Sequence, residues 1–314
     1  MQLQYTFDCS FFQWGRQISR WKCRSLTLIL SKVEIQEFLE SVLFVIVIYR
    51  LPILQSESWM SLEAELTHIG CDITVFIYDN SPEPQSMPQQ DKIKMYYHHD
   101  SSNAGVSAAY NEGHGLAFQL KKNWLFLLDQ DTRWPVGTLA QYARANKINP
   151  GGKIFVPIVC DKNGIVSPFL FQFGGGRRIG SVPYNPIPLK KYKAINSGML
   201  IRTESFGMVG GYENSIQLDF SDIAFLWKLQ KICDHLIIVN TELQLSFSGS
   251  STMIFHDALD RFKIYCKGAK SLGVMLDEKG MLWFRSLIRA LHLIIRFGRG
   301  RFLIVHIQTW CKAI

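Results

Sequence analysis

The chain has 314 residues, of which 47% are hydrophobic and 19% charged, and its formal net charge is +8. This composition excludes a disordered chain and a protein that crosses the membrane many times. The length fits one large α/β domain with an additional terminal segment, or two small domains. The positive charge favours an anionic partner, such as phosphate groups, nucleic acid or an anionic membrane surface.

The cysteines and the first residues indicate the compartment. Seven cysteines are spread along the chain without a C-x-x-C pair. Such an odd, irregular set is typical of thiols in a reducing compartment, not of a disulfide framework or a zinc site. The chain begins without the basic start, apolar region and cleavage site of a signal peptide. We therefore expect a cytoplasmic protein. The cysteines lie at positions 9, 23, 71, 160, 233, 266 and 311.

The pattern of strands and helices becomes clear at residue 42. Residues 1–40 are an extension of unclear structure, although 25–41 have a helical pattern. "VLFVIVIY" is a continuous apolar run, about half the length needed to span a bilayer. It therefore predicts a buried strand and not a membrane-spanning helix. "SESWMSLEAELTHIG" predicts a helix that begins at Ser56 or Ser58 and ends at Gly70. "DITVFIYDNS" then predicts a second strand, and this order is typical of a parallel βαβ unit.

The next segments extend this unit into a larger sheet. "IKMYYHH" predicts a more exposed third strand, "SNAGVSAAYNEGHGLAFQLKK" a loop that enters a helix, and "WLFLLDQDT" a fourth strand. Strands that alternate with helices predict an open, doubly wound and mostly parallel sheet. Ligands of such sheets bind beyond the carboxyl ends of the strands, where Asp79, Asp129 and Asp131 lie.

Asp129 and Asp131 are separated by one residue at the end of a predicted core strand. If the intervening side chain points the other way, both carboxylates lie on one face. Their repulsion favours a divalent cation, and oxygen ligands suit Mg²⁺ or Mn²⁺. Alternatively, Asp129 caps the following turn and Asp131 is solvated. The two residues alone leave both interpretations open.

An ordered set of motifs resembles family 2 glycosyltransferases, most closely the rhamnosyltransferase-like branch. The set is "VFIYDNS", "NAGVSAAYNEG", "LLDQDT", "INSGMLI" and "LDFSDIAFLWK", within about residues 42–270. The resemblance implies a nucleotide-diphospho-sugar donor, Mg²⁺ or Mn²⁺, an inverting mechanism and an α/β fold of the glycosyltransferase A type (Rossmann-like). In that fold a single domain, here 41–270, contains a central, mostly parallel mixed sheet.

The resemblance also implies which residues bind the donor. Asp79 matches the residue that contacts the nucleotide base. Tyr49 lies where the family lines the nucleotide pocket, although an ordinary aromatic residue at a strand end explains it nearly as well. Asn103, Gly105 and Asn111 match the family's N-x-G loop and the Asn eight residues beyond it. A simple loop with a helix cap would explain Asn103 and Gly105 but would leave Asn111 without a reason.

The same resemblance assigns the four remaining site residues. Asp129 lies by the ribose or the metal, and Asp131 ligates the metal. Asp222 in "LDFSD" matches the general base that takes the proton of the acceptor hydroxyl, with Asp219 supporting it or contacting the acceptor. One of these two aspartates can instead cap the helix "IAFLWKLQK", and both roles can hold together.

Departures from the family pattern keep other functions open. Ala224 stands where the family usually has an acidic residue, Lys228 where it often has Arg, and "LQLSFSG" has no His. His256 is better explained as a surface histidine than as a substitute. The main hypothesis is transfer of a sugar, plausibly rhamnose, to a growing surface polysaccharide or lipid-linked glycan. A galactosyl or galactofuranosyl transferase and a non-catalytic nucleotide-sugar-binding relative are the alternatives.

Residues 271–314 form a basic amphipathic segment in which arginines stand among large apolar residues. A helix of this kind fits peripheral contact with the anionic inner face of the cytoplasmic membrane. It fits equally well a helix packed on the catalytic domain with solvated arginines. Nucleic-acid binding is not expected, because the basic residues do not follow an aromatic-interleaved groove.

Overall fold

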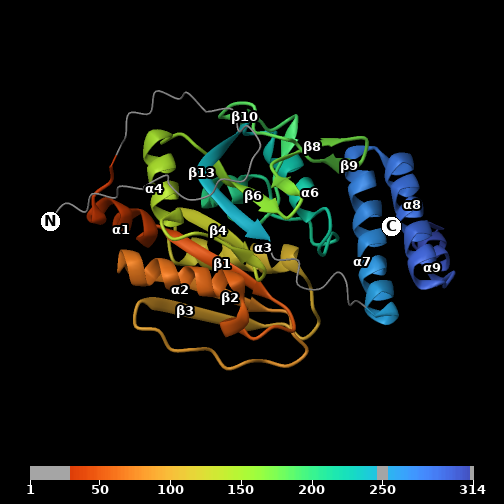
Figure 1. Cartoon of the computed structure of the whole chain (residues 1–314), viewed down its shortest axis with the longest axis horizontal. Helices are drawn as coiled ribbons and strands as arrows, with labels where there is room; N and C mark the ends of the chain where they lie inside the picture. Colours follow the sequence, from red (N-terminus) through yellow and green to blue (C-terminus); the bar gives the residue numbers. More distant parts are fainter. Residues whose placement is uncertain (1–28, 246–253, 312–314) are drawn as a thin grey trace.

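The computed structural model describes residues 29–245 and 254–311 (Figure 1). Their order of elements follows the predicted alternation of strands and helices in the first half of the chain. The strands are β1 (Val42–Ile48), β2 (Ile73–Asp79), β3 (Ile93–His99), β4 (Trp124–Asp129), β5 (Thr132–Arg133), β6 (Ile154–Asp161), β7 (Gly164–Ser167), β8 (Phe169–Gln172), β9 (Gly175–Arg177), β10 (Ile187–Pro188), β11 (Tyr192–Lys193), β12 (Met199–Arg202) and β13 (His235–Leu245). The helices are α1 (Lys32–Glu40), α2 (Glu57–Ile69), α3 (Val106–Gln119), α4 (Thr138–Ile148), α5 (Thr203–Met208), α6 (Ser221–Leu229), α7 (Phe255–Leu276), α8 (Lys279–Phe297) and α9 (Arg301–Cys311), with a short 3₁₀ turn, η1 (Ile53–Gln55).

One large mixed sheet organises the described residues. Its strand order is β10-β13-β6-β12-β4-β1-β2-β3, with β5 paired to β13 and β7 to β6. Strands β4, β1, β2 and β3 run parallel, and β13 runs parallel to β6. Strand β12 is antiparallel to both of its neighbours, β4 and β6, so those two strands point the same way. The predicted α/β class with a central, mostly parallel mixed sheet is therefore confirmed.

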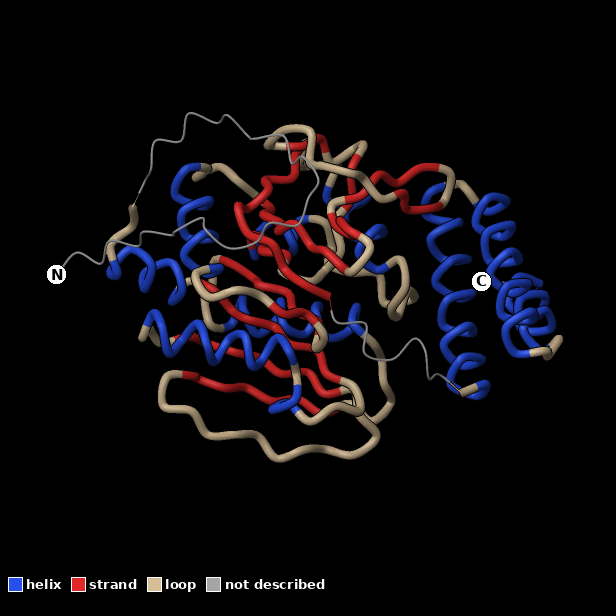
Figure 2. Tube along the Cα trace, in the orientation of Figure 1, coloured by secondary structure: helices blue, strands red, loops and turns tan. Residues whose placement is uncertain are grey.

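Each central strand buries both of its faces, which explains its continuous apolar sequence. Alternate residues of β1 enter different cores: Phe44 and Ile46 pack with α1, α2 and α4, while Leu43 and Val45 pack with α3, α5 and α6. Figure 2 shows these helices on the two sides of the strands. Strand β3 lies at the edge of the sheet and is the most exposed of the parallel strands, as predicted.

The ends of α2 follow local sequence signals. Of the two serines predicted as its N-cap, Ser56 takes that role, since its side chain accepts a hydrogen bond from the Trp59 amide. The Ser58 hydroxyl instead donates to the backbone carbonyls of Asp129 and Thr132, which ties α2 to the end of β4. Gly70 ends the helix with φ +70°, in the left-handed conformation that favours glycine.

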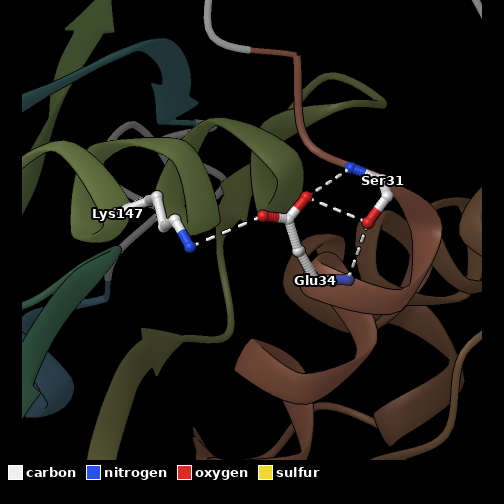
Figure 3. Close-up of polar contacts among 3 residues, drawn as sticks. All are labelled: Ser31, Glu34 and Lys147. Atoms are coloured by element: carbon white, nitrogen blue, oxygen red, sulfur yellow. Dashed lines mark hydrogen bonds and ion pairs between the residues drawn. The ribbon is translucent and has the colours of Figure 1, made fainter.

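Helix α1 is the described part of the extension 1–40, and residues 1–28 lie outside the described residues. It begins with a capping box: Glu34 N–H donates to Ser31 Oγ, while Ser31 N–H donates to Glu34 Oε2 at 2.8 Å (Figure 3). The other oxygen of Glu34 pairs with Lys147 of α4 at 3.5 Å. The Ser31 bonds lower the pKa of Glu34, so the carboxylate stays charged and joins α1 to α4.

The last three helices pack against one another at one side of the sheet domain, with α7 between that domain and α8 (Figure 1). Helix α8 ends at Gly298, whose φ of +65° ends it before α9. The predicted helical C-terminal segment is thus confirmed, as two helices. In the described ranges, none of the helices has the length and apolar character needed to span a bilayer.

Candidate active site at the carboxyl edge of the sheet

The site lies where β4 ends and α6 begins. Asp129 is the last residue of β4, Asp131 follows in the turn before β5, and Asp222 occupies the first turn of α6. Burial raises the pKa of all three carboxyl groups, and the charge of Asp129 raises the pKa of the other two further. The structure thus brings together three of the predicted site residues in one electrostatically coupled cluster.

Asp129 is held in place by two hydroxyl groups. Tyr110 of α3 donates to its Oδ1 at 2.9 Å, and Ser197 donates to its Oδ2. Burial raises the pKa of Asp129, and these two hydrogen bonds oppose the rise by stabilising the carboxylate. Its side chain is therefore held by α3 and by the loop before β12, contacts that a simple turn cap would not require.

Asp131 is half-buried, and its environment disfavours a negative charge. Burial and, next, the charge of Asp129 raise its pKa to about 6. Between the two aspartates, Gln130 turns toward the end of β1, where its Oε1 accepts the Tyr49 N–H at 2.7 Å. A cation beside Asp131 would relieve this repulsion.

The pKa of Asp222 is raised further than that of Asp131. Burial raises it to about 7, a hydrogen bond from the Ile223 amide at 2.7 Å opposes the rise, and Asp129 and Asp219 add to it. A carboxyl group with a pKa near neutrality is suited to exchange protons at physiological pH. The residue before the helix, Phe220, has φ +74°, a left-handed conformation that is uncommon for a bulky residue and sharpens the turn into α6.

Asp219 lies beside this cluster but is engaged by a helix of the C-terminal unit. Arg261 of α7 contacts both of its oxygens, at 3.0 Å and 2.7 Å. Arg261 Nη2 donates a hydrogen bond to Oδ1, and Nη1 forms an ion pair with Oδ2. Asp219 therefore anchors the loop before α6, the helix that carries Asp222, to α7, a role that the sequence analysis did not predict.

The N-x-G loop packs against the loop that precedes α6. The Val106 N–H donates to the Gln217 carbonyl at 3.0 Å, and the Gln217 side chain donates to the Asn103 carbonyl. Gly105 has φ +89°, and a Cβ there would lie 2.2 Å from the Gln217 carbonyl oxygen. Only glycine therefore permits this contact. Asn103 also has a positive φ, +53°, as asparagine tolerates.

Asn111 has a clear positioning role in the structure. Its Nδ2 donates to the Tyr212 carbonyl at 3.0 Å and to Asn214 Oδ1 at 2.8 Å, and its Oδ1 accepts the Tyr212 N–H at 2.7 Å. These bonds fix the backbone of the loop that leads toward Asp222. The sequence pattern that singled out Asn111 therefore coincides with a side chain that holds the loop.

The first two strand ends provide the remaining predicted residues. Asp79 is fully buried, and its carboxylate accepts the Ser81 N–H and the Tyr97 hydroxyl, each at 2.9 Å. Tyr49 is 38% exposed, and the Arg50 guanidinium lies 5.1 Å from its ring centre. Tyr49 thus offers an open ring surface, while Asp79 is enclosed by its own loop and by β3.

Several polar residues around the cluster were not predicted from the sequence. The Tyr212 hydroxyl donates to Asn196 Oδ1 at 2.7 Å, and Asn196 Nδ2 donates to Ser221 Oγ at 3.3 Å, next to Asp222. The signal was present in "INSGMLI", which contains Asn196 and Ser197, but the motif carried no role for either residue. Tyr110 and Ser197 became identifiable only through their contacts with Asp129.

A metal ion here would depend on few protein ligands. Among residues 29–245 and 254–311, no group of three or more His, Cys, Asp or Glu side chains is arranged to hold one. Asp131 and Asp129 nevertheless fit a cation, because burial raises the pKa of both carboxyl groups and the charge of Asp129 raises that of Asp131 further. Such a pair suits Mg²⁺ or Mn²⁺ with further oxygen ligands from a phosphate group and water.

The raised pKa of Asp222 predicts how stability depends on pH. The folded state keeps its proton up to about pH 7, whereas an unfolded aspartate loses it near 3.8. The contribution of Asp222 to stability is therefore fully present below pH 3.8 and is lost as pH rises through about 7. We expect Asp222→Asn to stabilise the metal-free protein at pH 7.5, by at most about 4 kcal/mol, and to change little at pH 4.

Urea denaturation of both proteins across this pH range would measure the difference. Asp161→Asn is the matched control with the opposite sign, because two contacts from Arg178, each 2.6 Å, lower the pKa of Asp161 to about 2. It should destabilise the protein at pH 7.5. Equal stability of the wild type and Asp222→Asn at every pH would contradict a raised pKa.

No protein-family model and no curated protein sequence matches the chain. Solved structures that are similar to part of it include the following two. A crystal structure of GalNAc-T7 with UDP, GalNAc and Mn²⁺ is 14% identical, with a TM-score of 0.45, over 65% of this chain and 43% of that one. The S. aureus TarS 1–349 structure is 11% identical, with a TM-score of 0.49, over 74% of this chain and 65% of that one. The matched part spans less than two thirds of either structure, and the likeness concerns the arrangement of strands and helices.

Proposed function

We propose that the chain is a metal-dependent, inverting glycosyltransferase of the glycosyltransferase A type. It would transfer a sugar from a nucleotide diphosphate to a hydroxyl group of a growing glycan. The observation that carries this proposal is the cluster of Asp129, Asp131 and Asp222 at the carboxyl edge of the sheet, where burial raises all three pKa values and the charge of Asp129 raises those of the other two further. The motif order that resembles family 2 enzymes gives it independent support.

The donor half of the site would be formed by β1, β2 and β4. Asp131, with Asp129 beside it, would hold Mg²⁺ or Mn²⁺ together with the diphosphate oxygens. The bound cation would neutralise the charge that develops on the departing nucleotide diphosphate. The open ring of Tyr49 offers a surface for the nucleotide base, and the loop of Asn103 and Gly105, which enters α3, supports the sugar side. Asp79 would set the shape of the base pocket through its bonds to Ser81 and Tyr97.

Asp222 would act as the general base. It accepts the proton of the acceptor hydroxyl as that oxygen forms its bond to the anomeric carbon, and the bond from that carbon to the phosphate oxygen breaks on the opposite side. Attack from the opposite side inverts the configuration. A pKa of about 7 lets Asp222 be deprotonated before attack and still bind the proton afterwards. Asp219 would position this base through its contact with Arg261, instead of touching the acceptor.

Rhamnose is the donor sugar that we propose, and a lipid-carried surface glycan is the acceptor, both on the motif resemblance. A galactosyl or galactofuranosyl transfer uses the same geometry. Ala224 and the absence of His in "LQLSFSG" keep a non-catalytic nucleotide-sugar-binding relative as the second candidate.

A thermal-shift screen of the full chain tests the proposal. Deoxythymidine- and uridine-diphosphate sugars are each added with and without Mn²⁺, and donor hydrolysis is measured for every sugar that binds. We expect one nucleotide sugar to raise the melting temperature more when Mn²⁺ is present, and to be hydrolysed. Tight binding without hydrolysis would favour the non-catalytic candidate. A shift that does not depend on Mn²⁺ would contradict metal dependence, and no shift with any sugar would contradict both candidates.

A further inference from the structure

Helix α8 presents a row of large apolar side chains away from the protein core. Met281, Phe284, Ile288, Leu291 and Ile295 recur every three or four residues, which places them along one face of the helix. Their exposed fractions lie between 38% and 81%, with Ile295 the highest. We call these five residues the apolar stripe. In α9, Ile304 and Ile307 are also about half exposed, at 53% and 50%.

The opposite face of α8 already has its packing partners. Leu282, Ser286 and Ala290 are fully buried, and Ser286 Oγ accepts the Trp310 indole N–H of α9 at 2.9 Å. The stripe is therefore an additional apolar surface and not the face that holds the bundle together. A contiguous row of exposed apolar side chains, on a helix whose opposite face is already packed, indicates a binding surface.

The charge on helices α8 and α9 has a single sign. Residues 279–311 contain no Asp or Glu. A second copy of the chain meeting this face would bring like charges together, whereas an anionic surface would be attracted. The basic residues of this segment are Lys279, Arg285, Arg289, Arg296, Arg299 and Arg301.

We propose that the apolar stripe and these cations dock the protein on an anionic lipid bilayer. Helix α8 would lie in the plane of the interface, with the stripe among the acyl chains and the cations at the level of the headgroups. The arginines that stack on the protein's own rings keep their charge there: the Arg289 guanidinium lies 4.1 Å from the Tyr265 ring centre, and that of Arg299 lies 4.5 Å from the Phe255 ring centre.

Contacts of α7 connect this surface to the candidate active site. Arg261, on one turn of α7, contacts Asp219. Tyr265, on the next turn of α7, packs against Phe220, with ring centres 5.0 Å apart. Both contacts reach the residues just before α6, the helix that carries Asp222. If Asp222 is the general base, as the proposed function has it, docking would fix the orientation of that base relative to the lipid surface. A lipid-carried acceptor would be presented at this surface.

Vesicle flotation of the full chain tests the docking surface. The vesicles contain phosphatidylcholine alone or mixed with phosphatidylglycerol. We expect binding to the mixed vesicles that weakens in high salt. Ile295→Glu should lower the partition coefficient about ten-fold or more, because it replaces a lipid-facing apolar side chain by a charge. Ile148→Glu on α4 is the matched control, since Ile148 is also exposed, at 55%, and its replacement changes the net charge equally.

The outcomes separate the alternatives. Loss of binding in Ile295→Glu but not in Ile148→Glu supports the proposal. Equal binding to neutral vesicles, equal effects of the two variants, or no binding would overturn it. A dimer in analytical ultracentrifugation that Ile295→Glu dissociates would assign the stripe to self-association instead. Donor hydrolysis, measured without lipid, reports separately on the proposed function, so that the two proposals can fail independently.

Discussion

Asp222→Asn is expected to lower sugar transfer by about two orders of magnitude or more, the usual scale for a lost general base. Asparagine has nearly the same shape and can still accept the Ile223 amide, but it cannot take a proton. Binding of the nucleotide diphosphate should remain close to that of the wild type, because the proposed donor half of the site is formed by β1, β2 and β4. Initial rates with the donor identified in the screen, and calorimetry with the nucleotide alone, measure the two effects.

The pH profile adds a more specific signature. With a pKa of about 7, Asp222 is protonated in acid and becomes a competent base as pH rises, so that kcat/KM of the wild type should increase with pH and level off above about 7. In Asp222→Asn the residual kcat/KM should not show this increase with pH. A variant that keeps the wild-type rate would remove Asp222 from the role of base.

Asp219→Asn is the informative companion variant. It removes the same charge three residues away, but it breaks the two-point contact with Arg261 and leaves the guanidinium without its carboxylate. We expect a lower melting temperature than that of the wild type and a smaller loss of rate than in Asp222→Asn. The increase of kcat/KM with pH should be retained. If neither variant showed the increase of kcat/KM with pH, both Asp219 and Asp222 would take part in the proton transfer.

The first half of the fold was predictable because its signals are local. The continuous apolar sequences of β1, β2 and β4 are typical of strands buried on both faces, and Ser56 and Gly70 mark the ends of α2. The second half was less predictable. Strand β12 has four residues and inserts antiparallel between β4 and β6, a pairing that no local pattern encodes.

The candidate site shows the same division. The position of Asp129 and Asp131 at a strand end could be read from the sequence, because the strand itself could. The contacts that give the residues their properties join distant segments: Tyr110 and Ser197 lie 19 and 68 positions from Asp129, and Arg261 lies 42 positions from Asp219. Such distances are set by the packing of α3, β12 and α7, so the roles of Asn111 and Asp219 became clear only in three dimensions.

Asp131→Asn is expected to abolish the gain in nucleotide affinity that Mn²⁺ provides. The amide keeps the size of the side chain but removes the charge that would attract the cation, while Asp129 stays committed to Tyr110 and Ser197. The loss should exceed the roughly 10–100-fold by which removal of an outer-shell partner weakens metal sites. Titration calorimetry of the nucleotide diphosphate with and without Mn²⁺ measures it directly.

The metal-free affinity decides how the result is interpreted. Removal of this half-buried carboxylate lessens the repulsion of the diphosphate, so Asp131→Asn should bind the nucleotide without Mn²⁺ as well as the wild type does, or better. Asp161→Asn, which removes an equal charge on β6, should keep the full Mn²⁺ dependence. If Asp131→Asn and Asp161→Asn respond to Mn²⁺ alike, the cation binds elsewhere, and the pair at the end of β4 serves only to position Tyr110 and the loop before β12.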